Sequence, residues 1–129
     1  MGATGPYGVL DQKDLIKAAR AAAPAGAKET IQHGRNGSID IKEAAPGGSV
    51  EVSRDTRGDT TFAAERPAVR AEVSVNRDGD VKGSQVAVTD GNYQPTKENV
   101  GKAEATANKA LGAALPGKRA PKAGLTLGL

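Results

Sequence analysis

The chain has 129 residues, enough for one small domain, and it is short of large apolar side chains. Val, Leu, Ile and Phe together number 22, there is no Trp, and Gly and Pro number 17 and 7. Without cysteine, disulfide frameworks and thiolate metal sites are excluded. Because aromatic side chains normally dominate core energetics, this composition predicts a chain that is marginal alone and is stabilised by partner chains.

The net charge of +3 comes from the C-terminal end of the chain. Residues 1–115 contain 15 basic and 15 acidic side chains, so the excess is due to Lys118, Arg119 and Lys122. A nucleic-acid-binding domain would carry a basic stripe on its folded face. Any contact with a polyanion is therefore expected at these three cations.

No apolar run is long enough to cross a membrane, and residues 1–6 lack the basic and apolar regions of a secretory signal. We therefore expect no membrane partner and no export. The expected location is a virion or the cytoplasm of a bacterial host.

The first element is an extended N-terminal arm over residues 1–10, in which Tyr7, Val9 and Leu10 could dock on a neighbouring subunit. The alternative for this segment is a flexible leader. A short helix is predicted over residues 11–23, with Asp11 as its N-cap and Pro24 ending it.

Residues 30–93 change to a period of two, as in Ile39-Asp40-Ile41 and Val50-Glu51-Val52. Turn signals such as Arg57-Gly58-Asp59 and Asp78-Gly79-Asp80 separate the alternating runs. Short strands at this spacing predict a small antiparallel β region and, with the flanking helices, an α+β fold.

An internal match lies within this region. The run Val50–Asp55 is matched by Val73–Asp78, and after a short gap Gly58-Asp59 is matched by Gly79-Asp80. We interpret the match as two similar hairpins, with Val50 aligned on Val73.

An Ala-rich helix is predicted over residues 96–115, which completes a single domain over residues 11–115. Its small side chains would allow close approach to a neighbouring element. The tail, residues 116–129, is basic and then apolar. Leu125, Leu127 and Leu129 alternate as in a strand added to a partner sheet, and an unstructured end is the alternative.

The residues that usually carry chemistry are sparse. His33 is the one histidine, and no second ligand of zinc type accompanies it. The run Ser74–Gln85 resembles a calcium loop at its central glycine but lacks the acidic residue at its last position, so a hairpin turn is the better interpretation. We predict no catalytic residues, no metal site and no cofactor.

These features together predict a non-catalytic structural subunit of a large protein assembly. The composition is typical of an accessory or minor bacteriophage virion protein in a capsid, tail or connector, with other subunits, including copies of itself, as partners. The alternative is a small β binding module that engages nucleic acid or another polyanion through its basic tail, in a weak and salt-dependent contact.

Overall fold

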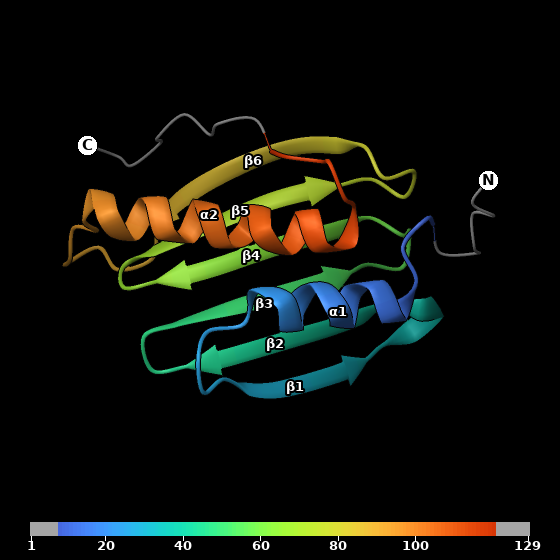
Figure 1. Ribbon diagram of the computed structural model, residues 1–129, viewed down its shortest axis with the longest axis horizontal. Coiled ribbons are helices and arrows are strands. Elements are labelled where there is room, and N and C mark those ends of the chain that lie inside the picture. Colours follow the sequence, from blue (N-terminus) through green and yellow to red (C-terminus); the bar gives the residue numbers. More distant parts are fainter. Residues whose placement is uncertain (1–7, 121–129) are drawn as a thin grey trace.

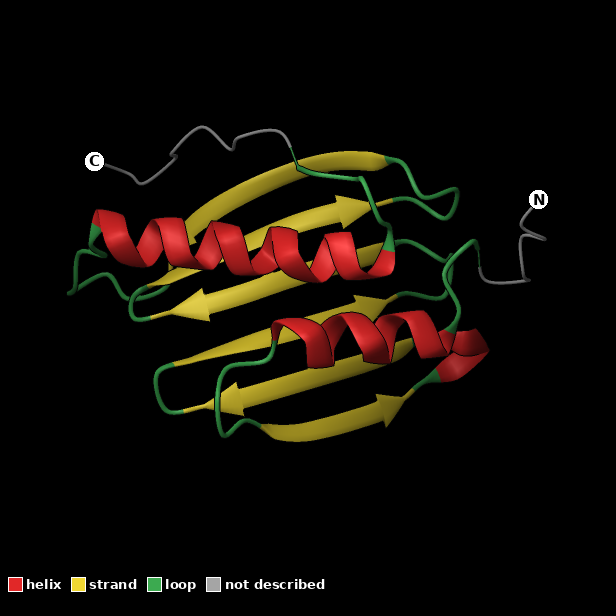
Figure 2. Ribbon diagram, in the orientation of Figure 1, coloured by secondary structure: helices red, strands yellow, loops and turns green. Residues whose placement is uncertain are grey.

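The computed structural model describes residues 8–120, which form two layers (Figure 1). Two helices lie side by side on one face of a six-stranded antiparallel sheet (Figure 2). The strands follow one another in chain order, so each pairs with the strand before it. The predicted α+β class is thereby confirmed. The elements are α1 (Gln12–Ala22), β1 (Lys28–His33), η1 (Arg35–Gly37), β2 (Ile39–Ala45), β3 (Gly48–Arg54), β4 (Thr60–Arg66), β5 (Val69–Val75), β6 (Val81–Val88) and α2 (Lys97–Ala114).

The alternation in the sequence decides which face of the sheet each side chain takes. In β3, Val50 and Val52 are buried against the helices, and in β5, Val69 and Val73 are buried in the same way. The alternate residues Glu51, Arg70 and Glu72 are polar and point to the other face. Antiparallel sheets commonly bury one face and leave the other polar, and this sheet follows that arrangement.

The strands repeat at a regular interval along the chain. β3 begins at Gly48 and β5 at Val69, and the same interval separates the start of β4 at Thr60 from the start of β6 at Val81. The two similar hairpins expected from the sequence are therefore present. The alignment of Val50 on Val73 was wrong, because Val50 lies two residues farther from the turn that follows it than Val73 does.

One five-residue turn is used three times, at residues 34–38, 55–59 and 76–80. In each, the first N–H donates to the last carbonyl over 2.9 Å, as Asp55 does to Asp59 and Asn76 to Asp80. The fourth residue is always a glycine with positive φ, such as Gly58 at 93° and Gly79 at 89°. The Arg57-Gly58-Asp59 tripeptide thus lies in a turn of the sheet.

α1 begins at its predicted cap, Asp11, and α2 begins after the cap Thr96, the first residue of the predicted helix. The Asp11 carboxylate accepts from the Asp14 N–H and the Asp14 carboxylate accepts from the Asp11 N–H, both at 3.0 Å, which forms a capping box. The Thr96 hydroxyl accepts from the Asn99 N–H over 3.0 Å at the start of α2.

The core lies between the helices and the sheet and is continuous within one chain. Its largest fully buried side chains include Phe62, Leu15, Ile41 and Leu111. Alanines fill the rest, among them Ala18, Ala19, Ala103, Ala107 and Ala110, and let the helices approach each other and the sheet. A core that composition led us to expect only with partner chains is therefore built from the chain's own residues.

Leu10 also belongs to this core, although the sequence placed it in a docking arm. It is 5% exposed. The buried Arg54 guanidinium holds it there, because Nη1 donates to the Leu10 carbonyl over 2.7 Å while Nη2 donates to the Gly37 carbonyl over 2.7 Å. The expected arm over residues 1–10 thus enters the domain before its predicted end.

Candidate functional site

The face of the sheet opposite the helices is polar, and no element of residues 8–120 covers it (Figure 2). Cross-strand register places small polar side chains in one row across the strands. A second row alongside carries the charges. The first row is Gln32, Asp40, Ser53, Thr61 and Ser74, and the second is Thr30, Lys42, Glu51, Ala63, Glu72 and Gln85.

Arg70 organises the charged part of this face. Its Nη2 donates to Glu51 Oε1 over 2.9 Å and its Nε to Glu72 Oε1 over 3.1 Å, while Nη1 lies 3.9 Å from Glu65 Oε1. Ala63 pairs with Glu51 on one side and with Glu72 on the other. The guanidinium that bridges these two therefore passes over Ala63, which accounts for its complete burial on an otherwise open face.

A carboxyl pair lies beside this network. Burial and a hydrogen bond with Glu51 raise the pKa of Asp40 to about 6. The hydrogen bond from Asp40, together with Arg70, holds the pKa of Glu51 below its usual value. Asp40 thus releases its proton at a higher pH than an ordinary aspartate, and while protonated it shares that proton with Glu51.

A hollow of about 390 Å³ at the end of β1–β3 brings Asp40 near His33 and Ser53. These are residue types that serve in nucleophilic catalysis. Among the described residues, however, no hydrogen bond joins His33 to Asp40 or to Ser53. The hollow therefore assembles no activated nucleophile.

A second carboxyl pair lies on the helix-facing side, at the seam between α1 and the first hairpin. Glu29 and Glu43 are direct partners in the β1–β2 register. Arg20 of α1 donates to both oxygens of Glu29, over 2.8 and 2.9 Å. This bond lowers the pKa of Glu29 to about 2, whereas burial raises the pKa of Glu43 to about 7.

Glu43 is only 4% exposed, and its Oε2 has no hydrogen-bond partner in the described part of the chain. Sequence reasoning missed this pair. The signal in the sequence was the position of Glu43. It continues the alternation of Ile39 and Ile41, so it falls on the side of β2 that faces the helices.

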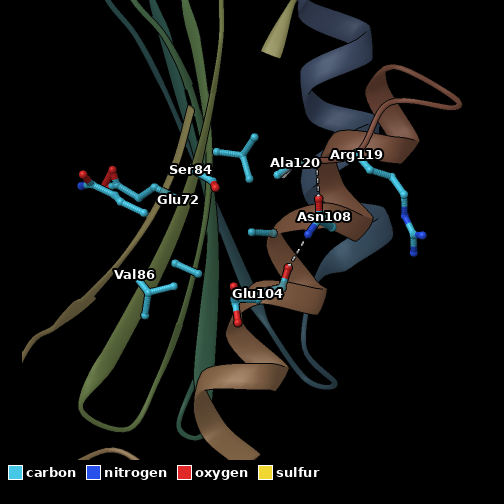
Figure 3. A pocket seen from close by; sticks show the side chains of 11 residues that line it. Glu72, Ser84, Val86, Glu104, Asn108, Arg119 and Ala120 are labelled. Atoms are coloured by element: carbon cyan, nitrogen blue, oxygen red, sulfur yellow. Dashed lines mark hydrogen bonds between the residues drawn. The ribbon is translucent and has the colours of Figure 1, made fainter. Parts of the chain in front are cut away.

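A cavity of about 380 Å³ lies between α2 and strands β5 and β6 (Figure 3). Small side chains such as Ala71, Ala107 and Ala120 line it. The Asn108 side chain donates to the Glu104 carbonyl over 3.2 Å and accepts from the Ala120 N–H over 2.8 Å. This amide therefore anchors the segment after α2 and is not directed at a ligand.

The residues predicted to dock are distributed as follows. Val9 is exposed, and its N–H donates to the Arg77 carbonyl over 2.9 Å, so it lies along the third five-residue turn. Lys118 and Arg119 are exposed in the segment that follows α2. The remaining predicted contacts lie outside the described residues: Tyr7, Lys122, Leu125, Leu127 and Leu129.

We compared the chain with models of protein families, with curated proteins and with solved structures, and nothing matched in any of these comparisons. Among residues 8–120, no helix combines the length and the apolar character needed to cross a bilayer. A function for this chain has to be argued from its own residues.

Proposed function

We propose that the chain is a non-catalytic structural subunit of a large protein assembly, as an accessory or minor bacteriophage virion protein of the capsid, tail or connector. The observation that carries this proposal is the uncovered polar face of the sheet. Three of its carboxylates, those of Glu51, Glu65 and Glu72, are already gathered around Arg70, so they hold a fixed surface rather than reach for a small ligand.

The size of this face supports contact with another protein surface. Six strands about 4.8 Å apart and seven residues long give a face of about 24 by 23 Å, or roughly 550 Å² before side-chain relief. That approaches the roughly 800 Å² that each partner contributes to a standard interface. Ser53, Thr61 and Ser74 are short, so a flat partner can approach closely along their row.

The structure changes which part of the chain a structural subunit of this kind would use to bind its partners. The core is complete within one chain, so partners are not needed to fill it. Docking would instead use the exterior of a domain that is already folded, with the sheet face as the principal surface. The bacteriophage assignment itself rests on composition.

The test is a charge placed in the middle of the small polar row. Thr61→Arg puts a long cation on the open face, and Gln12→Arg puts the same cation on the exposed surface of α1. Particles purified on a density gradient from the native host should contain the wild-type chain and Gln12→Arg. Thr61→Arg should be depleted at least several-fold, while its circular dichroism stays unchanged.

If the wild-type chain sediments only as a free small protein, the structural role is wrong. Equal incorporation of Thr61→Arg and Gln12→Arg would remove the sheet face from the proposal.

The binding-module alternative has one observation in its favour. Lys118 and Arg119 lie exposed and adjacent after α2, where they could contact a polyanion. Deleting residues 117–129 should then abolish a weak binding to duplex DNA, measured by fluorescence anisotropy at low salt, and leave particle incorporation intact. If the wild-type chain shows no binding to DNA at low salt, this alternative fails.

A further inference from the structure

The two edges of the sheet differ. β6 pairs with β5 through a register shift between Ser74 and Val75, and both Ser84 and Val86 have further interactions. β1 pairs with β2 residue for residue, from Lys28 opposite Ala44 to His33 opposite Ile39. Within residues 8–120, the backbone of β1 bonds to no strand other than β2. β1 is therefore a regular edge whose outer backbone groups are available for pairing.

The side chains beside this edge are partly apolar. α1 packs over β2 and β3, which leaves β1 at the margin of the helix layer. Ile16 and Ile31 pack against the core but stay partly exposed. Ile16 lies one helical turn before Arg20, which reaches Glu29 on β1, so both isoleucines lie at this margin.

We propose that β1 pairs antiparallel with β1 of a second copy of this chain, which joins the two sheets into one of twelve strands. This inference rests on the proposed structural role, for which it names a partner and a surface. The pairing is a two-fold, self-complementary contact, as in most homodimers.

The sequence of β1 selects one register for this pairing. Residues on the helix-facing side of β1 meet helix-facing residues of the second copy only when the two-fold axis passes through a residue position. An axis between two residues would set them against residues of the polar face. With the axis at Ile31, the two Ile31 side chains meet, and Glu29 faces His33 of the second copy. An axis at Thr30 would put Glu29 against the second Ile31, and an axis at Glu29 would oppose two carboxylates. The axis at Ile31 alone joins apolar to apolar and opposes no like charges.

The contact is short, so the dimer is expected to be weak. A single strand of six residues buries less than the roughly 800 Å² per partner of a standard interface. The association should therefore depend on concentration. Within an assembly, where copies are held close together, the same contact would be populated.

A cysteine at the proposed axis provides the test, because the natural chain has none. Directly opposed Cβ atoms in an antiparallel pair lie about 4.5–5.5 Å apart, close enough for a disulfide after a small adjustment. Ile31→Cys should give a covalent dimer with twice the mass of the single chain under mild oxidation. The matched control is Val88→Cys, which places a thiol at an exposed position on the opposite edge strand.

Sedimentation of the unmodified full chain supplies the second readout. Its mass should rise from one chain toward two as concentration increases, and Ile31→Lys should abolish the rise where Val88→Lys does not. A chain that stays monomeric, with Ile31→Cys crosslinking no faster than Val88→Cys, would overturn the pairing. The structural role would survive that result, because Thr61→Arg tests it on a different surface.

Discussion

The surroundings of the Glu43 side chain disfavour its ionised form. The groups that face it are Arg20 from α1 and Glu29 from β1, and Arg20 is already engaged in two bonds to Glu29. On β3 its neighbour is the apolar Val50. Protonated Glu43 can share its proton with Glu29, whereas ionised Glu43 stands against a like charge.

This arrangement predicts a pH dependence of stability. Since the pKa of Glu43 rises from its usual 4.5 to about 7 on folding, the stability that its protonated form provides is full below pH 4.5 and is lost as pH rises through 7. Glu43→Gln keeps the shape and removes the titration. We expect the urea midpoint of the wild-type chain to fall more between pH 5 and pH 8 than that of the variant.

Glu98→Gln is the control for this comparison. Glu98 forms an exposed pair with Lys102 at 2.8 Å, which lowers its pKa and keeps its titration below the pH range tested. If the fall between pH 5 and pH 8 is the same in Glu43→Gln as in the other two chains, Glu43 is not the group that titrates.

At the scale of elements, most of the fold could be predicted from local chemistry. Asp11 and Thr96 are caps whose side chains satisfy free N–H groups, and they fix where the helices begin. Valine alternation marks the strands. The Arg57-Gly58-Asp59 and Asp78-Gly79-Asp80 runs mark turns, because the glycine in each takes positive φ.

The alignment of the repeat could not be read in the same way. Val50-Glu51-Val52 and Val73-Ser74-Val75 look alike, yet the structure places Val52, and not Val50, in the position of Val73. A strand has a period of two, so shifting it by two residues keeps every side chain on its face. Only the turns, each with its single glycine, align the two hairpins correctly, with Gly58 on Gly79.

The candidate surfaces depend on contacts that no local pattern predicts. Whether Glu43 lies against Glu29 depends on the pairing of two strands joined by a turn, and whether Arg70 covers Ala63 depends on three strands. The sequence showed these residues only as members of alternating runs. The docking residues that sequence reasoning did select come from the two ends of the sequence; of those that the structure describes, Leu10 lies in the core and Val9 lies along the third five-residue turn.

For the whole molecule, the composition argument and the structure lead to different expectations. Few bulky side chains suggested a fold that requires partners. In the structure, the alanine-rich helices instead pack closely on the sheet, and this close packing compensates for the lack of large side chains. Leu111, near the end of α2, is fully buried. Close packing of this kind supports a chain that folds alone.

The isolated full chain should therefore unfold in one cooperative transition. Leu111→Ala should lower its free energy of unfolding by about 2–5 kcal/mol, because it leaves a cavity between α2 and the sheet. Lys109→Ala, two residues earlier on the exposed side of the same helix, should change it by less than about 0.5 kcal/mol. Denaturant titration followed by circular dichroism measures both. A gradual loss of signal without a cooperative transition, or equal effects of the two substitutions, would mean that this core forms only when other chains pack against it.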